Sequence, residues 1–578
     1  MDSKRQIKTK ASALLLASTM LISLLAGCSG NKNVETVAPV DKGTDSTTTT
    51  TATKTEDTTP MTLSLFSADP SPNWTGMKDE TGKIITEKTG ITLDAEFAVG
   101  DPQQKVGLIA ASGEYPDLIS AKNDISKLVD AGAMLDLTDL IDQYAPNIKK
   151  VLGDYTKRAR YSDEDHAIYA IPTYAGVDNQ SLRATGGFEL QHRAVKEAGY
   201  PEIKTVQDYE NVIKSYIDKH PTDENGNKNI GLTLNADDWY MYITVTNPAF
   251  YATGSSDDGE YAIDVDTQKV TYHYKRPVEK EYFRWLNHMN DIGLLDPESF
   301  VQKYDQYKAK IATGRVVGLI DQDWAYGDGE KALKTANKLD QGYGHYPVTL
   351  SSQYKETSFW PTGFMAGYGI GISVDCKDPV RAIKFLDYLA SDEGQVLLNW
   401  GVEGKDYKIE NGKRVIPADV ATRKINDATN FAKETGIGLY STLSVHYGDG
   451  VQDPTGSYYT TSFPEQIVAD YNAVEKETLA AYKVTTWREL FPKDDEFKVK
   501  PWGAAWNIAI PGDSEIVILD NKLKDITWKR IPEAILAKPA NFDKVWDSYM
   551  QELDKAGVDK AQTLREELVK QRVKLWNE

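Results

Sequence analysis

Residues 61–99 read MTLSLFSADPSPNWTGMKDETGKIITEKTGITLDAEFAV. The run MTLSLF at 61–66 alternates apolar and polar residues, as a strand with one buried face does, and the Pro-rich ADPSPNWTG breaks it. ETGKIITEKTG follows with helix-forming residues, and ITLDAEFAV at 91–99 alternates again. A strand, a helix and a second strand in this order predict the opening of an α/β lobe.

The same alternation continues along the chain. Residues 103–112 predict a helix, and Leu118 and Ile119 predict a short strand. The stretch AGAMLDLTDLIDQYAPNIKKV at 131–151 predicts a further short strand and helix, and HAIYAIPTYAG at 166–176 a strand that leads into a glycine turn. Strands that alternate with helices favour a largely parallel sheet.

A second region of the same kind begins near residue 188. FELQHRAVKEAGY at 188–200 predicts a helix closed by Gly199. TVQDYENVIKSYIDKH predicts an amphipathic helix with Thr205 as its N-cap. RVVGLIDQDWAYGDGEKAL at 315–333 predicts a buried strand that runs into a loop presenting Trp324.

The chain then returns to a strand followed by helices. GYGIGISVDCKDPVRAIKFLDYLASDEGQVLLNWG at 367–401 predicts a strand and a helix, and residues 541–578 predict a helical C-terminus. Four apolar residues of the first helix recur at i, i+3, i+4 and i+7 and so share one face. They are Ala382, Phe385, Leu386 and Leu389.

The N-terminus has the order of a secretory signal. Residues 1–10 are basic, and residues 11–27 are apolar and uncharged but shorter than the roughly 20 residues of a membrane span. The next residue, Cys28, completes LAGC, which resembles a bacterial lipobox whose cysteine is lipidated and becomes the new N-terminus. Two acyl chains suffice for stable anchoring. An ordinary signal sequence that happens to contain a cysteine is the alternative.

The segment after Cys28 lacks the side chains for a core. Residues 29–60 hold ten threonines between Thr44 and Thr59 and almost no large apolar residue. Such a segment cannot bury enough surface to offset its chain entropy, so it predicts a disordered tether. The other cysteine, Cys376, then has no intrachain partner, and the fold depends on packing instead of disulfides.

Composition excludes some classes of partner. The formal net charge of −20 argues against nucleic acid or anionic lipid as the main partner. No other apolar run is long enough to cross a bilayer. The chain holds 12 Trp and 32 Tyr, whose flat apolar faces with polar edges are suited to stacking on sugar rings, although many of them must be core.

Five stretches together resemble the extracellular solute-binding proteins of ABC importers, family 1, in the long oligosaccharide-binding lipoprotein branch of Gram-positive bacteria. Each motif is modest alone, but their order and spacing behind a lipobox make the resemblance specific, and it covers nearly the whole mature chain. The stretches are LIAASGEYPDLIS, AGAMLDLTDLIDQYAPNI, HAIYAIP, CKDPVRAIKFLDYLASDEGQVLLNWGVEGKDY and IPEAILAKPANFDKVWDSYMQELDKAG.

The resemblance implies an α/β, two-lobed periplasmic-binding-protein-like fold of type II, with lobes joined by crossing hinge segments. We expect crossings near Ile171–Gly176 and Trp360–Tyr368 and a third after Gly401. The expected parts are a lipoprotein signal peptide (1–27), a disordered Thr-rich linker (28–60), the N-lobe (61–175), the C-lobe (176–362), a return to the N-lobe (363–430), and the C-lobe completion with the C-terminal helices (431–578).

Motifs for catalysis are mostly absent. GMKDETGKI at 76–84 has five residues between its glycines where a P-loop has four, and Ile84 stands where Ser or Thr should hold magnesium. No histidine is followed by Glu, so there is no HExxH zinc site, and no GxSxG elbow occurs. Carboxylate pairs for glycoside hydrolysis depend on three-dimensional separation. We therefore expect a protein that is not an enzyme and requires no cofactor.

Binding candidates follow from position, because ligands of open α/β sheets lie beyond the carboxyl ends of strands. In the resembled family, aromatic side chains at such positions stack on sugar rings, and polar groups beside them bond to hydroxyls. Packing inside a lobe is the alternative for each ring. The candidates are the aromatic residues Trp74, Tyr174, Trp239, Tyr240, Trp324 and Trp360 and the polar residues Asn123, Asp124, Asp321 and Asp323.

PTDENGNKNIG at 221–231 spaces oxygen-bearing side chains two apart, as in the first half of a calcium loop. Some alginate-type relatives hold a structural calcium ion in a similar loop. Here the closing acidic pair is missing, and an Asn-Gly hairpin turn explains the residues equally well. The four candidate ligands are Asp223, Asn225, Asn227 and Asn229.

The resemblance implies a monomeric receptor, lipid-anchored on the extracellular face of the cytoplasmic membrane, that captures an oligosaccharide by domain closure and delivers it to an ABC permease. A receptor of the same fold for a peptide or another solute is the first alternative, and a surface glycan hydrolase is a remote one. The sequence leaves open whether the sugar is neutral or a uronide, since Arg158, Arg183 and Arg193 lie near a crossing.

Overall fold

The strands of this chain are divided between two main sheets. A computed structural model describes residues 57–578, so the signal segment, Cys28 and the linker up to residue 56 lie outside the described residues. The first lobe is built on a five-stranded sheet and the second on a four-stranded one. In spatial order the first sheet is β2 (Ile91–Phe97), β1 (Met61–Ser67), β3 (Leu118–Ser120), β11 (Gly369–Ile372) and β4 (Ile171–Pro172). The second is β10 (Tyr343–Tyr346), β5 (Gly186–Gln191), β9 (Val316–Gln322) and β6 (Ile230–Thr233).

The first sheet confirms the parallel opening that the sequence predicts. β1 pairs in parallel with β2 from Met61 opposite Ile91, and with β3 on its other side. β11, which arrives from far along the chain, is antiparallel to both β3 and β4. The helix between β1 and β2 is α1 (Glu80–Thr89), whose first turn is capped by the Asp79 carboxylate and whose end is the left-handed Gly90.

The second sheet is mixed, and here two predictions are wrong. β5 is antiparallel to both β9 and β10, and only β6 pairs in parallel with β9, so this sheet is not largely parallel. Phe188–Gln191 lies in β5, where a helix was predicted, and the helix α6 (His192–Glu197) begins only after it. All six residues of β5 are buried between partner strands that lie more than a hundred residues away. Local sequence carries no sign of that pairing.

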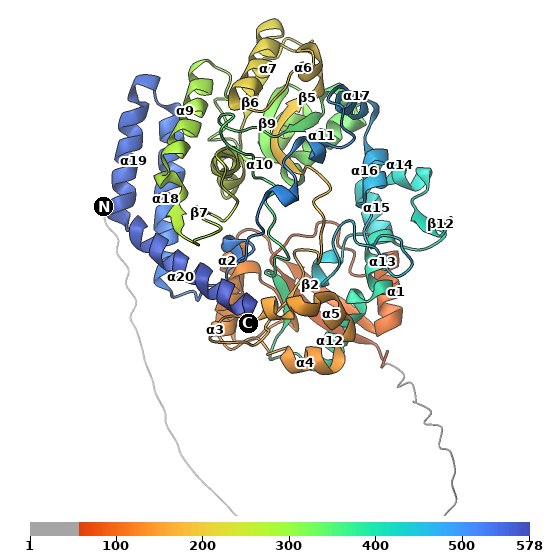
Figure 1. Cartoon of the computed structure of the whole chain (residues 1–578). Coiled ribbons are helices and arrows are strands. Elements are labelled where there is room, and N and C mark those ends of the chain that lie inside the picture. The colour runs from red at the N-terminus through yellow and green to blue at the C-terminus, as the bar shows by residue number, and fades with distance from the viewer. Residues whose placement is uncertain (1–56) are drawn as a thin grey trace, which may run out of the picture. The chain divides into compact units, whose positions relative to one another are not determined.

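Helices cover both sheets (Figure 1). The predicted N-cap of α7 is confirmed, since Thr205 and Asp208 form a capping box, and the predicted apolar face of α12 is buried. The other helices of the first lobe are α2 (Pro102–Ser112), α3 (Ile125–Asp130), α4 (Thr138–Tyr144), α5 (Pro146–Leu152), α12 (Pro379–Ala390) and α13 (Asp392–Trp400). Those of the second are α7 (Val206–Lys219), α8 (Asn247–Ala252), α9 (Pro277–Asp291), α10 (Tyr304–Ala312) and α11 (Asp323–Thr335).

The last third of the chain serves both lobes. Tyr440, Leu443 and Val445 pack in the core of the first lobe, beyond the predicted return segment, while α18 and α19 lie side by side with α9 of the second (Figure 1). The last helix, α20 (Val558–Asn577), starts in the second core and ends with Trp576 in the first. The limits of the lobes stay predictions. The other elements are the helices α14 (Ala418–Asn426), α15 (Ala428–Thr435), α16 (Pro464–Asp470), α17 (Ala473–Ala481), α18 (Glu515–Leu536) and α19 (Phe542–Ala556), and the hairpins β7 (Tyr261–Ile263) with β8 (Val270–Tyr272) and β12 (Lys408–Glu410) with β13 (Lys413–Val415).

The chain passes from the first sheet to the second between β4 and β5 and returns between β10 and β11. We call these connections, residues 173–185 and 347–368, the first and second crossing segments. Among residues 57–578, no helix is both long enough and apolar enough to span a bilayer. Each sheet has its own apolar core, so the crossings join two separately packed bodies.

A buried carboxylate attaches an irregular C-terminal segment to the second lobe. Asp258 accepts hydrogen bonds from Lys500 Nζ at 3.0 Å, Trp502 Nε1 at 2.8 Å and the Ala505 backbone N–H at 3.0 Å. The Asp258 and Lys500 side chains are 0% and 2% exposed. A buried charge must be paired and hydrogen-bonded, and this carboxylate meets that demand with these three donors on Oδ1 and the Ser256 hydroxyl on Oδ2 at 2.6 Å.

Replacing Asp258 should therefore cost far more than replacing an exposed partner of a neighbouring lysine. We expect Asp258→Asn to lower the free energy of unfolding by about 3 kcal/mol, because it removes the carboxylate that is paired with the buried Lys500 ammonium. Asp266→Asn is the matched control, since Asp266 and Lys498 are both mostly exposed, and it should leave stability unchanged. Urea unfolding of the two variants measures the difference, and equal midpoints would contradict this role of Asp258.

Candidate functional site

Both crossing segments line the same cavity. It has a volume of about 730 Å³, within the range of about 300–1,000 Å³ that is usual for small-molecule sites. The first crossing contributes residues 174–181, and the second contributes residues 359–365. Residues within 441–449 and 460–462 and within 395–399 of α13 form much of the remaining wall, and Tyr155, Asp494 and Val499 complete it. Because the connections between two lobes move when one lobe moves against the other, a site built on them changes shape with that movement.

The first crossing is bonded through its backbone to the segment 446–450. Val177 N–H donates to the His446 carbonyl oxygen, and Gly448 N–H donates to the Val177 carbonyl oxygen, both at 2.8 Å. A Cβ atom on Gly176 would lie 2.4 Å from the Cα of Gly448, so the two backbones approach too closely for a side chain there. Glycine is therefore required where the two segments meet.

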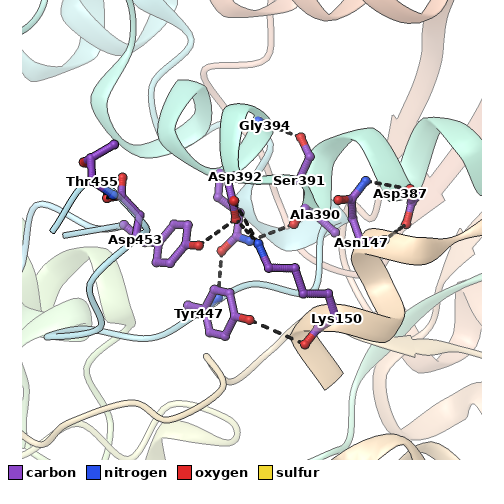
Figure 2. Close-up of polar contacts among 12 residues, drawn as sticks. Asn147, Lys150, Asp387, Ala390, Ser391, Asp392, Gly394, Tyr447, Asp453 and Thr455 are labelled. Atoms are coloured by element: carbon purple, nitrogen blue, oxygen red, sulfur yellow. Dashed lines mark hydrogen bonds and ion pairs between the residues drawn. The ribbon is translucent and has the colours of Figure 1, made fainter. Parts of the chain in front are cut away.

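A cluster of polar side chains in the first lobe forms hydrogen bonds with the segment 447–459 (Figure 2). Asp392, at the start of α13, accepts from Lys150 Nζ at 2.8 Å and from the Tyr459 hydroxyl at 2.6 Å. Tyr447 N–H donates to Gln395 Oε1 at 2.8 Å. Burial alone would raise the pKa of Asp392, but the hydrogen bonds from Lys150 and Tyr459 outweigh it and hold that pKa below its usual value. The cluster thus fixes residues 447–459 against the first lobe.

Two of the predicted aromatic residues, Tyr174 and Trp360, line this cavity. Tyr174 is 54% exposed, and its ring packs edge-on against Tyr368 at 5.0 Å between centroids. Trp360 donates from Nε1 to the Lys498 carbonyl oxygen at 2.7 Å, which fixes the indole on the second crossing. The structure therefore brings together one ring from each crossing segment.

Three other predicted aromatic residues form a separate stack on the second lobe. The Trp239 and Trp324 rings are nearly parallel, with centroids 5.5 Å apart, and Tyr240 stacks on Trp239 at 4.6 Å and on Tyr304 at 4.2 Å. Trp324 is 54% exposed and Trp239 46% exposed. These rings are available to solvent, but they do not line the cavity at the crossings, and their role in ligand binding stays a prediction.

The two predicted aspartates beside Trp324 differ in their surroundings. Asp321 is fully buried and accepts hydrogen bonds from the Tyr307 hydroxyl and the Gln322 N–H, both at 2.7 Å. Asp323 is half-buried at the start of α11, and burial raises its pKa while the charge of Arg183 opposes the rise. Asp321 therefore has no exposed atom with which to bond a ligand hydroxyl.

The remaining predicted binding residues lie in the first lobe, outside the cavity. Trp74 packs edge-on against Phe97 and Tyr440, with centroids 5.5 and 5.3 Å away. Asn123 donates from Nδ2 to the Trp506 carbonyl oxygen at 3.3 Å. Asp124 forms an ion pair with Lys127 at 2.7 Å. None of these three predicted residues lines the cavity at the crossings.

Several residues of the cavity escaped the sequence analysis. Asp178, Asn179, His446, Asp449 and Thr460 line it but belong to no motif. One signal was available: Asp449 stands between two glycines in the run HYGDG, a pattern typical of close backbone approach. The other four lie in irregular segments whose neighbours are set only by the fold.

The Asp223 loop forms the hairpin turn that was the alternative to a calcium site. Asp223 Oδ1 accepts from the N–H groups of Asn225 and Asn227, and Oδ2 accepts from Asn227 Nδ2. Asn229 donates from Nδ2 to the His220 carbonyl oxygen at 2.9 Å. Calcium prefers six to eight oxygens with carboxylates among them, whereas the four predicted ligands include one carboxylate, Asp223, which already accepts hydrogen bonds from the loop itself. As it stands, the donor set does not fit the ion.

Comparisons with known proteins agree with this arrangement. A family model described as bacterial extracellular solute-binding protein matches residues 80–399. The fructooligosaccharide ABC transporter substrate-binding protein FusA of Streptococcus pneumoniae is 22% identical over 505 residues, which are 83% of this chain and 85% of that relative. Lipoprotein LipO of Bacillus subtilis is 22% identical over 427 residues, 71% of this chain and 75% of LipO.

Solved structures share the fold. An EF-hand mutant of S. pneumoniae FusA in complex with fructo-nystose aligns with a TM-score of 0.63 and 18% identity, covering 88% of this chain and 99% of FusA. The alginate-binding protein AlgQ2, solved without calcium ion, aligns with a TM-score of 0.60 and 19% identity, covering 90% of this chain and 98% of AlgQ2. At these identities the likeness shows the two-lobed fold alone.

The buried carboxyl group of Asp321 predicts a pH dependence of stability. Burial raises the pKa of Asp321 to about 7, whereas an aspartate in an unfolded chain has a pKa of about 3.9. Between these values the folded state keeps a proton that the unfolded state has released, so the free energy of unfolding falls as the pH rises. We expect Asp321→Asn to remove this fall, which is on the order of 1 kcal/mol per pH unit.

Urea unfolding between pH 4.5 and 8 measures the effect. Asp305→Asn is the control, since the Asp305 side chain is 94% exposed and it should reproduce the profile of the unmodified protein. If the Asp321→Asn profile ran parallel to that of the control, the proton on Asp321 would have no bearing on stability.

Proposed function

This chain belongs to the bacterial extracellular solute-binding proteins, and on that premise we propose that it captures an oligosaccharide in the cavity at the two crossings and delivers it to an ABC importer. The curated relative FusA is named for fructooligosaccharide binding in such a transporter. The observation that carries the proposal is the cavity itself, which the first crossing lines with the exposed ring of Tyr174 and the second with the half-buried ring of Trp360, beside many hydrogen-bonding groups.

The lining is suited to sugars because it offers both of the contacts that sugars use. Tyr174 and Trp360 present apolar ring faces for the C–H face of a pyranose or furanose. Asn179, Asp449 and Thr460 present side-chain donors and acceptors for hydroxyl groups. A dissociation constant near 1 µM, about −8 kcal/mol, is within reach of two or three such stacked rings with their hydrogen bonds.

We propose domain closure as the mechanism. A ligand held by residues of the crossing segments contacts the lobes fully only when they have closed on it, so binding shifts the equilibrium toward the closed state. The closed state is the form that the permease subunits of the importer would recognise, and the protein would act as a monomer without catalysing a reaction. The two separately packed cores support this, because a close-packed core resists deformation and would let each lobe move as a unit.

Attachment to the membrane is part of the proposal. The LAGC run ends at Cys28, after an apolar segment, and LipO, one of the similar proteins, is named a lipoprotein. Lipidation of Cys28 would hold the protein at the extracellular face of the cytoplasmic membrane on a tether of residues 29–60.

No ion is needed for this mechanism. The four residues predicted to bind calcium include one carboxylate, Asp223, and both of its oxygens accept hydrogen bonds within the loop. The loop is distinct from the residues that line the cavity. We therefore propose that sugar binding is independent of calcium.

Titration calorimetry with a panel of oligosaccharides tests the function, and Tyr174 provides the sharpest variant. We expect Tyr174→Ala to weaken binding about tenfold, or about 1.4 kcal/mol, because it removes a stacking face from the cavity. Tyr174→Phe keeps the ring and should retain most of the affinity. Since the ring is largely exposed, neither change should alter the melting temperature much. A panel in which no oligosaccharide binds would refute the proposed function.

The anchor is tested separately from the site. We expect Cys28→Ala to abolish incorporation of an alkyne-labelled palmitate analogue and to release the protein from the membrane fraction, because the thiol is the acceptor in the proposed thioether. Cys376→Ala is the control, because Cys376 is buried. Labelling that persists in the Cys28→Ala variant would contradict the anchor.

A further inference from the structure

The charged side chains that line the cavity all have the same sign. Asp178, Asp449 and Asp494 line it, and among residues 57–578 no lysine or arginine does. A sugar hydroxyl donates a hydrogen bond to a carboxylate, whereas the carboxylate group of an ionised uronate is repelled by one. We infer that the cavity binds an uncharged oligosaccharide and rejects one built of uronic acids, an inference that rests on the proposed function.

Asp449 is the aspartate most constrained by its surroundings. Its N–H donates to Asn179 Oδ1 at 2.9 Å, and its Oδ1 accepts from the Thr460 hydroxyl at 2.8 Å. Burial raises the pKa of Asp449, and the Thr460 hydrogen bond and the charge of Arg183 oppose that rise. A carboxylate has room for about four donors, so this group can still accept from ligand hydroxyls. A second carboxylate brought to the same place would meet a group of like charge.

The guanidinium of Arg488, next to the lining residues Ser181 and Asp494, already donates hydrogen bonds to three groups of the protein. Arg488 donates to Asp494 Oδ1 and to the Pro492 carbonyl oxygen, both at 2.6 Å, and to Ser181 Oγ at 3.2 Å. Its charge therefore offsets that of Asp494. The carboxylates of Asp178 and Asp449 are the other charges of the lining, and Arg183 acts on Asp449 from outside it.

The three arginines that the sequence offered as uronate partners lie outside the lining. Arg158 donates to the Phe364 carbonyl oxygen at 2.7 Å, and Arg193 donates to the Gly314 carbonyl oxygen at 2.6 Å in the second lobe. Arg183 is exposed and acts on Asp449. None of them provides the bidentate contact with which proteins hold a carboxylate in a cleft.

The one histidine of the lining adds no positive charge at neutral pH. His446 Nδ1 lies 2.9 Å from the Ser444 carbonyl oxygen. Burial lowers the pKa of His446, so its ring is uncharged. With the histidine neutral, Asp178 and Asp449 decide the sign of the potential in the cavity.

Matched pairs of ligands test the inference by calorimetry at pH 7.5. The probes are β-1,4-mannotriose against trimannuronate, cellotriose against its triglucuronate, and α-1,4-galactotriose against trigalacturonate, since the members of each pair differ only in oxidation at C6. For any pair that binds, we expect the uronide to bind at least about 100-fold more weakly than its neutral partner at low salt. The difference should shrink as the ionic strength rises.

The outcomes separate the two claims. A uronide that binds as tightly as its neutral partner overturns the inference but leaves the proposed function standing. If neither the six ligands nor a kestose control binds, the proposed function is overturned, and this inference with it.

The variant Asp449→Asn tests whether the weaker binding of uronides arises from the charge inside the cavity. Asparagine still accepts from Thr460 but carries no charge, so the ratio of neutral to uronide affinity should fall about tenfold. Asp178→Asn, at an exposed position, should reduce the ratio in the same direction and covers the case in which Asp449→Asn fails to fold.

Asp495→Asn is the matched control. Asp495 is exposed next to Asp494 but does not line the cavity, so this change removes the same charge from the chain. We expect it to leave the ratio unchanged. A control that moves the ratio as far as Asp449→Asn would assign the selectivity to the net charge of the protein and overturn the inference.

Discussion

The close approach of Gly176 to Gly448 is the contact on which the cavity depends. A single Cβ on Gly176 would lie 2.4 Å from the Cα of Gly448, so only two bare backbones can meet there. Their meeting allows Val177 to exchange hydrogen bonds with residues 446 and 448. That exchange places Asp449 beside Asn179 and gives the cavity one wall from the first crossing and one from a segment 270 residues later.

Irregular segments can form such a wall only if their polar groups are satisfied. The crossings contribute little to either sheet, and their backbone therefore bonds to other loops and to buried side chains. Asp258 bonds Lys500, Trp502 and Ala505 to the second lobe. Asp392 bonds Lys150 and Tyr459 in the first. In the region where the two lobes join, the hydrogen bonds to these carboxylates take the place of the backbone hydrogen bonds of a sheet.

Sequence and structure agree most where structure is local. The opening strands, the cap at Thr205 and the apolar face of α12 follow from neighbours a few residues apart. In contrast, the sequence predicts a helix over part of β5, and this prediction is wrong because β5 pairs with strands more than a hundred residues away. The site follows the same rule: of the predicted residues, Tyr174 and Trp360 line the cavity, and they lie on segments that were themselves predicted to cross.

The sequence by itself determined the class of fold and the likeness to solute-binding proteins, because periodicity, caps and ordered motifs are local properties. Only the tertiary structure decided which side chains share a cavity and which charges they bring to it. Asp178 and Asp449 meet in the lining while Arg158 and Arg193 bond elsewhere. Electrostatic potential depends on distances in space, and the order of residues along a chain does not contain those distances.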